Sequence, residues 1–589
     1  MIEISDEDIA KNEEKFDVMF DDNRRNVLKN MNSIDIVACA GSGKTTLMCS
    51  KIDLLTQKQY YNSKGIIVLS LTNVAIEQIR KKLGKNHNIF KYPNYCETIQ
   101  KFVNTFILNN WYISKYKRKL EIVDTDYFIK SFRKKIGYRK CYFLDNNKFL
   151  YDEVIFDGVN IFYGNDRIED ISIGELRKEK LNEYVECLKE AKLELVKNGI
   201  FNYRDAFEIG IRYLRENEKI RKYIKNRFEI IFIDEMQDCR KWEKNFLDIC
   251  FSDVIFQKIG DPNQQIYEET FWNIDPNCVL SINNSLRNSI EIANFSERFQ
   301  DVHYEINGNH KNNIKVKFIV YKKENILQVK EKFVELIKKE NLDKLSGKKF
   351  KIIGRIAKKN EKGKITLYDY FNQQVGKIEN IFEKTFSNYL VDNKNRIFKT
   401  LIDMMYYCYE RIDKLNFCHI NDKQEFIQKI ETYVDKKEIY INLNESEQSL
   451  CDFCKSFIRK VLKNIFNDKK YFEIEFSKLI NETSVEFENI KEFCKDEINI
   501  QINTIAGVKG ETHTATLVCE TFYKKYDIEY VLDKYIKNNQ KNKTVIDLLH
   551  TLYVGFTRPT ELLCLAIREE TYDLCEDIIN KLGVEIIKI

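Results

Sequence analysis

The feature that most constrains this chain of 589 residues is a glycine-containing turn between an apolar strand and a helix. The strand begins at Asp35, the turn holds Gly41 and Gly43, and the helix is expected to begin near Thr45. Residues 38–45 match the P-loop pattern except that Ala38 stands at its first glycine. Such a loop turns backbone N–H groups toward phosphates, with Lys44 neutralising the β- and γ-phosphates and Thr45 binding Mg²⁺. The segment predicts a nucleoside triphosphate site, and a chance glycine-rich turn is the alternative.

Two further apolar strands end in acids, which speaks against the chance turn. The segments 228–235 and 254–261 each place carboxylates where a parallel sheet binds ligands, at the carboxyl ends of its strands. Asp234 is expected to hold Mg²⁺, and Glu235 to orient and deprotonate a water molecule. Ionised acids are costly as core filling. The chemistry predicted from the residues alone is phosphoryl transfer to water.

Alternating strands and helices predict an α/β fold with two cores, each interrupted by a mostly helical insertion rich in charge. The second core is expected to include apolar strands near 314–318, 350–353, 498–502, 515–518 and 562–567. The expected parts are core 1 at 1–102 and 226–280, its insertion at 103–225, core 2 at 281–356 and 496–589, and its insertion at 357–495.

Short motifs follow one another along both cores: Ala38–Thr45, Leu71-Thr72-Asn73, Thr98–Phe102, Ile233–Asp238, Gly260–Tyr267, Leu286-Arg287, Thr504–Glu511 and Tyr553–Arg558. In this order they resemble the motifs of the UvrD/Rep/PcrA-like superfamily 1A DNA helicases, over nearly the whole chain. The resemblance implies two RecA-like P-loop cores, ATP with Mg²⁺ held by Thr45 and Asp234, and a DNA partner. It also implies movement from 3′ to 5′ on single-stranded DNA.

The resemblance also implies roles for individual residues. Gln237 and Gln264 would sense the γ-phosphate, while Arg287 and Arg558 would act as arginine fingers from the second core, a role that suits the charge of a phosphoryl transition state. Surface arginines in solvated pairs are the alternative. The predicted catalytic set is Lys44, Asp234, Glu235, Gln264, Arg287 and Arg558. The predicted nucleotide-binding set is Asn23 (where the family has an adenine-reading Gln), Arg24, Ala40, Gly41, Ser42, Gly43, Lys44, Thr45, Thr46, Gln237, Gly510 and Glu511.

Several aromatic positions of the family pattern are not aromatic in this chain. Leu286 replaces an aromatic that stacks on adenine, which predicts relaxed base selectivity. Leu71 and Glu269 replace aromatics that hold single-stranded DNA, and Ala506 replaces a His. ATP hydrolysis is therefore expected to survive these changes better than unwinding.

A basic, aromatic stretch at 111–140 is a candidate DNA-binding surface. It carries ten basic residues against three acids, and its aromatics are Trp111, Tyr112, Tyr116, Tyr127, Phe128, Phe132 and Tyr138. Exposed aromatics would stack bases while the cations bind phosphates. The alternative is a solvated basic face with its aromatics in the core. The net charge of +5 over the whole chain decides nothing.

The remaining features concern the compartment and metals. The acidic N-terminus does not resemble a secretory signal, and no apolar run reaches the ~20 residues needed to span a bilayer, so a cytoplasmic protein without a membrane partner is expected. Cys451 and Cys454 have CxxC spacing, with Cys408, Cys418, His419 and Cys494 as conceivable further ligands of a metal. Two thiols on one buried helix face are the commoner reading of that spacing.

The resemblance leaves three functions open: an ATP-dependent DNA helicase or translocase, a DNA-end-sensing NTPase subunit that signals to a nuclease, and a stand-alone repair helicase. The segment after Arg558 is short for an appended nuclease domain, so any nuclease is expected to be a separate chain. The compact insertions and the Gly510–His513 motif are similar to the helicase-like subunit of the Gabija anti-phage system, which acts with a nuclease partner.

Overall fold

The computed structural model describes residues 3–58, 64–137, 140–141, 144, 149–168, 178–266, 272–360, 363–372, 405–406, 409, 456–466, 472–473, 492–496 and 498–589. The chain divides into two compact units. One comprises Met1–Arg355 with Thr504–Ile589, and the other comprises Ile356–Asn503.

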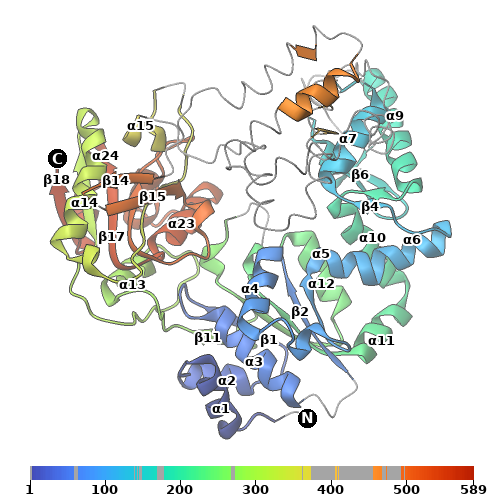
Figure 1. Ribbon diagram of the computed structural model, residues 1–589, viewed down its shortest axis with the longest axis horizontal. Helices are drawn as coiled ribbons and strands as arrows, with labels where there is room; N and C mark the ends of the chain where they lie inside the picture. The colour runs from blue at the N-terminus through green and yellow to red at the C-terminus, as the bar shows by residue number, and fades with distance from the viewer. Residues whose placement is uncertain are drawn as a thin grey trace. The chain divides into compact units, whose positions relative to one another are not determined.

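The first sheet of the larger unit is entirely parallel, and its strands stand in the order β11-β1-β10-β9-β2-β3. Its strands are β1 (Ile34–Ala38), β2 (Gly65–Ser70), β3 (Tyr95–Thr98), β9 (Phe228–Ile233), β10 (Ile255–Gly260) and β11 (Val279–Ile282). Strands β1 and β2 are buried along their whole length, as expected for a parallel sheet covered on both faces. The helices around it include α1 (Asp6–Phe16), α2 (Asp22–Lys29), α3 (Lys44–Lys58), α4 (Asn73–Leu83) and α12 (Lys241–Cys250) (Figure 1).

A second parallel sheet in the same unit has the order β13-β16-β17-β12-β18. Its strands are β12 (Lys317–Tyr321), β13 (Phe350–Gly354), β16 (His513–Cys519), β17 (Pro559–Arg568) and β18 (Glu585–Lys588). Helices α14 (Val329–Lys339) and α24 (Glu569–Lys581) lie beside it in Figure 1. Its other helices are α13 (Ile290–Glu297), α22 (Asp527–Val531) and α23 (Lys543–Phe556). Two parallel α/β cores are thus present, and the predicted fold class is confirmed.

The segment between β3 and β9 is mainly helical, as expected, but it also contains small sheets. Its helices are α5 (Ile99–Phe102), α6 (Asn109–Tyr116), α7 (Thr125–Ile136), α9 (Lys178–Lys197), α10 (Tyr203–Glu216) and α11 (Glu218–Arg227). Strand β4 (Ile122–Val123) pairs with β8 (Ile200–Phe201), and β5 (Val154–Phe156), β6 (Ile161–Tyr163) and β7 (Asp166–Arg167) form an antiparallel sheet. A fully buried ion pair between Lys192 and Asp205 (2.7 Å) joins α9 to α10.

The structure differs from the sequence-based expectation at one core boundary. Strand β11 pairs with β1, so the first sheet continues to Ile282 and the boundary expected between residues 280 and 281 falls inside a strand. Strands β3 and β18 were not predicted either. Each of these three strands has four residues, too few to establish a periodic pattern.

The smaller unit is described in part. It contains α15 (Leu367–Phe371) and an antiparallel pair of β14 (Glu492–Lys495) with β15 (Ile498–Thr504). Cys494 is exposed, while Cys451, Cys454, Cys408, Cys418 and His419 lie outside the described residues.

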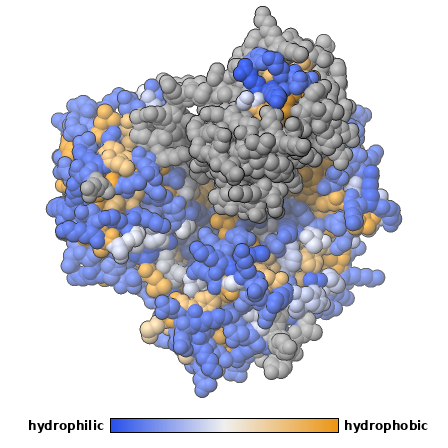
Figure 2. Space-filling model, viewed as in Figure 1, coloured by the Kyte–Doolittle hydropathy of each residue, from blue (hydrophilic) through white to orange (hydrophobic). Residues whose placement is uncertain are grey.

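Hydrophilic residues cover most of the described surface on the face drawn in Figure 2, with hydrophobic residues scattered among them. Within the described part of the chain, no helix combines the length and apolar character that crossing a membrane requires.

One buried cation predicts a pH dependence of stability. The ammonium group of Lys51 on α3 donates hydrogen bonds to the carbonyls of Val27 (2.6 Å) and Asn30, and burial lowers its pKa from 10.5 to about 7. A neutral amine still has two hydrogens for these two acceptors. Because the unfolded chain keeps this proton up to about pH 10.5, unfolding takes up a proton between pH 7 and 10.5, and stability rises with pH in that window.

Urea unfolding of the wild type and Lys51→Met at pH 7 to 10 measures this contribution. We expect a flatter pH profile for the variant, with ~1–3 kcal/mol lost to the two unsatisfied carbonyls. The same slope in both proteins would contradict the assignment.

Candidate functional site

The carbonyls of the loop between β1 and α3 accept hydrogen bonds from side chains and from the backbone of a distant segment. Lys44 Nζ donates to the carbonyls of Ala38 (3.0 Å) and Cys39 (3.2 Å). The carbonyl of Ala40 accepts from Ser285 Oγ (2.8 Å), that of Gly41 from the N–H of Leu286 (2.9 Å), and that of Ser42 from the Arg24 guanidinium. Five successive carbonyls are therefore anchored, and we call this segment, residues 38–42 with Gly43, the cradle. It is a concave backbone suited to an anion.

Glycine is required at two cradle positions. Gly41 and Gly43 have φ values of 74° and 83°, a region that L side chains rarely adopt. A Cβ on Gly41 would also lie 2.5 Å from the Cβ of Arg287. The backbone of the 284–288 segment thus closes directly over the loop, and this contact brings the predicted Arg287 to the predicted P-loop.

The two acids after β9 are held in different states. Burial, followed by the charge of Glu235, raises the pKa of Asp234, while the hydroxyl of Thr45 hydrogen-bonds to the Asp234 carboxylate. Burial alone would raise the pKa of Glu235, but Lys44, Lys509, a hydrogen bond from Gln237 and Arg558 outweigh it and lower the pKa. Glu235 has a left-handed backbone (φ 55°). It is therefore an ionised, partly buried carboxylate beside the loop, as a general base requires.

A chain of hydrogen bonds joins Glu235 to the second core. Gln237 Nε2 donates to Glu235, and Gln237 Oε1 accepts from the N–H of Asp261 (3.1 Å). Gln264 Nε2 donates to the Asp261 carboxylate (2.7 Å), and Gln264 Oε1 accepts from Arg558 Nη2 (3.2 Å). We call this series the relay. Asp261 joins the two predicted glutamines, and Gln264 contacts the predicted Arg558 directly.

Both arginines remain protonated at neutral pH. Burial, with the charge of Arg558 second, lowers the pKa of Arg287 to about 9, and burial lowers that of Arg558 to about 10. Arg287 Nη1 donates to the carbonyl of Thr557 (3.1 Å), next to Arg558 in the chain. The two cations therefore share one corner of the site.

Sequence reasoning missed several residues of the site. Lys509 pairs with Asp238 and donates to the carbonyl of Gln264 (2.8 Å), so it joins the relay from the second core. Tyr304 is hydrogen-bonded to the Asp261 carboxylate and to Tyr553 (3.1 Å). Lys509 lies within the Thr504–Glu511 motif, but its partner and that of Tyr304 are distant in sequence, so no local pattern could reveal these contacts.

Lys82 of α4 was also missed. Its ammonium group donates to the hydroxyl of Thr46 in the first turn of α3. None of the ion pairs formed by the described residues includes Lys82. It therefore adds a second lysine beside the cradle.

Of the other predicted nucleotide-binding residues, two are open to solvent and two are held by protein groups. Asn23 is exposed, and a Cβ added at Gly510 (φ 83°) would have no neighbour within 4 Å. The Glu511 carboxylate pairs with Lys351 (2.5 Å) and contacts His513 (3.2 Å), while its carbonyl accepts from Arg558 Nη1 (3.3 Å) at the end of the relay. Arg24 is buried against protein carbonyls.

The cradle fits a nucleoside triphosphate with Mg²⁺. Ser42 Oγ is buried without a hydrogen-bond partner, which leaves a donor available to a phosphate oxygen. The hydroxyl of Thr45 and the carboxylate of Asp234 are the oxygen ligands that Mg²⁺ prefers, and they lie together.

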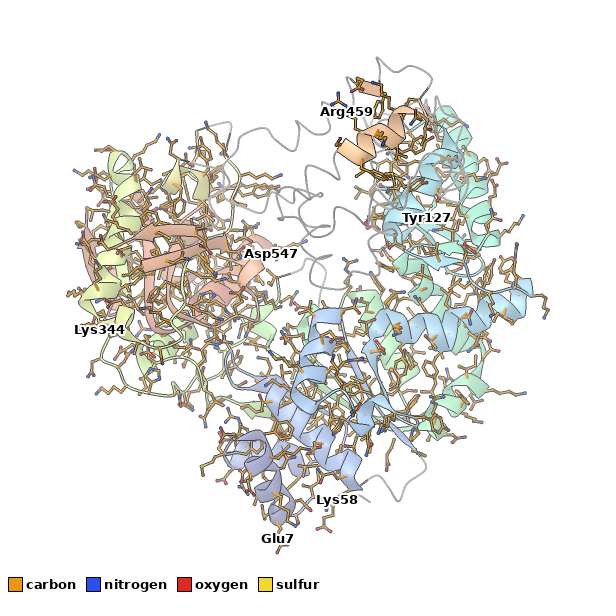
Figure 3. All side chains as sticks on the ribbon, viewed as in Figure 1. Glu7, Lys58, Tyr127, Lys344, Arg459 and Asp547 are labelled. Atoms are coloured by element: carbon orange, nitrogen blue, oxygen red, sulfur yellow. The ribbon has the colours of Figure 1, made fainter. Side chains whose placement is uncertain are left out.

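Most aromatic side chains of the basic stretch at 111–140 lie in the core of the insertion, as the alternative interpretation predicts. Tyr112, Phe128 and Phe132 are fully buried and Trp111 nearly so. Tyr127 on α7 is 47% exposed, and Tyr138 lies outside the described residues (Figure 3). Lys135 pairs with Glu194, and Arg118 donates to the carbonyl of Lys197. Base stacking by the whole aromatic set is excluded, because core side chains cannot reach a base.

A different aromatic lies at the carboxyl edge of the second sheet. Tyr523, shortly after β16, is 58% exposed. The Arg355 guanidinium, directly after β13, and the Lys524 ammonium each lie 5.8 Å from its ring centroid. An exposed ring flanked by cations at a sheet's carboxyl edge suits a stacked base and its phosphate.

Comparison with known proteins gives a consistent set. Residues 19–287 match the family model of the UvrD/REP helicase N-terminal domain. A probable DNA helicase II homolog of Mycoplasma capricolum is 24% identical over 47% of this chain and 38% of its own length. Another from Mycoplasma genitalium is 21% identical over 89% of this chain and 81% of its own length. The Gabija protein GajB of Bacillus cereus is 25% identical over 41% of this chain and 40% of its own length. The matches to the first and third of these relatives span about two-fifths of their length.

The Lys509–Asp238 pair predicts a measurable coupling between the cores. Both side chains are largely buried (15% and 7% exposed), so Lys509→Met should destabilise the protein by ~3–5 kcal/mol by leaving a buried carboxylate unpaired. Asp238→Asn should recover part of that loss in the double variant. Thermal unfolding of the four proteins gives the coupling, with the exposed pair Lys222–Glu218 as control. Additive effects would show that the pair carries no coupling.

Proposed function

Because residues 19–287 of the chain belong to the UvrD/REP helicase N-terminal domain family, we propose that the protein is a DNA-dependent ATPase that translocates on or unwinds DNA. The observation that carries the proposal is the relay, which connects the acid beside the cradle to Arg558 of the second core. A nucleotide bound at the cradle would meet groups from both cores. Hydrolysis there changes the contacts that join the cores, which is what a motor needs.

Each group of the site has a task in this mechanism. The cradle amides and Lys44 bind the phosphates, and Thr45 and Asp234 hold Mg²⁺, which neutralises phosphate charge when bound. Glu235, kept ionised by Lys44 and Lys509, accepts a proton from the attacking water. Arg287 and Arg558 stabilise the charge on the transferring group, an effect worth ~10³–10⁵ in rate. Gln264 accepts a hydrogen bond from Arg558, so the position of one side chain depends on the other.

A second candidate is a DNA-end-sensing NTPase that regulates a separate nuclease in anti-phage defence. Similarity to the Gabija protein GajB favours it. The replacement of DNA-holding aromatics at Leu71 and Glu269 also favours a chain that hydrolyses nucleotide without efficient stepping. In this candidate the relay reports DNA state to the partner rather than driving movement.

Steady-state ATP hydrolysis on single-stranded oligonucleotides of graded length tests the proposal. A translocating motor should hydrolyse faster as the strand lengthens and then saturate. A rate set by the number of DNA ends would favour the sensor. Glu235→Gln should lower the rate by ~10²–10⁴ while retaining nucleotide binding, whereas Lys44→Ala should lose both. Unchanged hydrolysis in either variant would place the active site elsewhere.

Tyr523 predicts where single-stranded DNA is held. Tyr523→Leu should weaken binding of a short oligonucleotide by ~1–3 kcal/mol, whereas Tyr523→Phe keeps the ring and should bind like the wild type. Fluorescence anisotropy measures both. Tyr127→Leu, which removes the exposed tyrosine of α7, is the matched control and should change little. Weakened binding in that control alone would move the DNA path to the insertion.

A further inference from the structure

Arg24 makes contacts that the nucleotide-binding role does not account for. Its side chain is 3% exposed, and its Nε and Nη2 both donate to the carbonyl of Ser42 (3.3 and 2.7 Å). Nη2 also donates to the carbonyl of Asn284 (2.8 Å), and Nη1 pairs with Asp21. The guanidinium is thus directed at protein groups from three segments: α2, the cradle, and the chain leading to Arg287.

A closed ring of contacts fixes the orientation of this side chain. Asp21 caps α2 by accepting from the N–H of Arg24 (2.9 Å), and its other oxygen accepts from Asn284 Nδ2 (2.7 Å) as well as from the guanidinium. Helix α2 packs against α3, which follows Ser42 in the chain, and against β11, which precedes Asn284. These bonds leave from three different nitrogens of the planar guanidinium, whereas the three N–H groups of a lysine share one nitrogen, so lysine is not equivalent here.

Holding the Ser42 carbonyl has a direct consequence for the cradle. The peptide bond between Ser42 and Gly43 is planar and trans, so its carbonyl and its N–H point in opposite directions. When Arg24 fixes the carbonyl on the outside, the N–H of Gly43 is aimed to the inside, where a phosphate would bind. The same guanidinium holds Asn284, three residues before Arg287, and so positions the strand of chain that carries this cation.

We propose that Arg24 is a positioning residue for nucleotide hydrolysis. Without touching the nucleotide, it sets the direction of the Gly43 N–H and the place of the Asn284–Arg287 segment. The inference rests on the proposed ATPase function. It assigns Arg24 to the phosphate part of the site rather than to the base.

The test compares Arg24→Lys and Arg24→Ala with Arg25→Ala. Arg25 is the matched control, because it binds Glu13 and the carbonyl of Phe20 and so holds α2 to α1, away from the cradle. Both Arg24 variants should raise KM for ATP and lower kcat, reducing kcat/KM about 10- to 100-fold, as misplaced groups do. Methylguanidinium should restore part of the activity of Arg24→Ala and none in Arg25→Ala.

Inorganic tripolyphosphate separates positioning of the cradle from contact with the base. Its inhibition constant against ATP should rise in Arg24→Lys by about the same factor as KM. A raised KM with an unchanged tripolyphosphate constant would overturn the inference by assigning Arg24 to the base or ribose. Full activity of Arg24→Lys would overturn it as well, because charge alone would suffice.

Asp21→Asn covers the case in which the Arg24 variants fail to fold. Asparagine retains the helix cap but removes the charge that orients the guanidinium, so a smaller loss of kcat/KM, about 3- to 10-fold, is expected. A wild-type rate in this variant would contradict the ring. If the wild type neither binds nor hydrolyses ATP, the proposed function fails; if it hydrolyses ATP and the Arg24 variants match it, only this inference fails.

Discussion

The anchoring of the loop carbonyls at residues 38–42 by hydrogen bonds is the interaction on which the rest of the site depends. A backbone that binds anions must expose N–H groups and hide carbonyls, and each carbonyl left inside would repel a phosphate. Ser285, Leu286 and Arg24 hold the carbonyls of residues 40–42, while Lys44, which would bind the phosphates, contacts those of Ala38 and Cys39. Two of these donors come from the segment after β11, so the cradle is complete only when the last strand of the first sheet is in place.

Contacts between the two cores follow from the same arrangement. Ser285 Oγ donates to the cradle carbonyl of Ala40 and to Asn288 Oδ1. Asn288 Nδ2 in turn donates to the carbonyls of Thr557 (3.3 Å) and Pro559 (2.7 Å). Arg558 lies between those two carbonyls in the chain and ends the relay. Loop, arginine and acid therefore share one connected hydrogen-bond network, and a change at any member alters the geometry of the others.

Much of the fold could be predicted from residue patterns, and the site only in part. Strands β1, β2, β9 and β10 are apolar runs with turn residues or acids at their ends, and Lys44, Asp234 and Glu235 follow from their positions after such strands. The roles of Lys509 and Tyr304 could not be assigned from the sequence, because they arise from contacts with distant Asp238 and Asp261. In the insertion, the sequence pattern suggested a function that the structure does not support. Its composition suggested a stacking surface, but Phe128 and Phe132 are one helical turn apart and face the core together.

The left-handed backbone of Glu235 lowers the stability of the fold at a residue that the site requires. A side chain at this φ costs roughly 1–2 kcal/mol, which glycine would recover. Glycine would also remove the carboxylate that Lys44, Lys509 and Gln237 hold in its ionised form. The backbone strain at Glu235 is therefore offset by contacts of the same side chain that would act on the attacking water, so strain and activity reside in one residue.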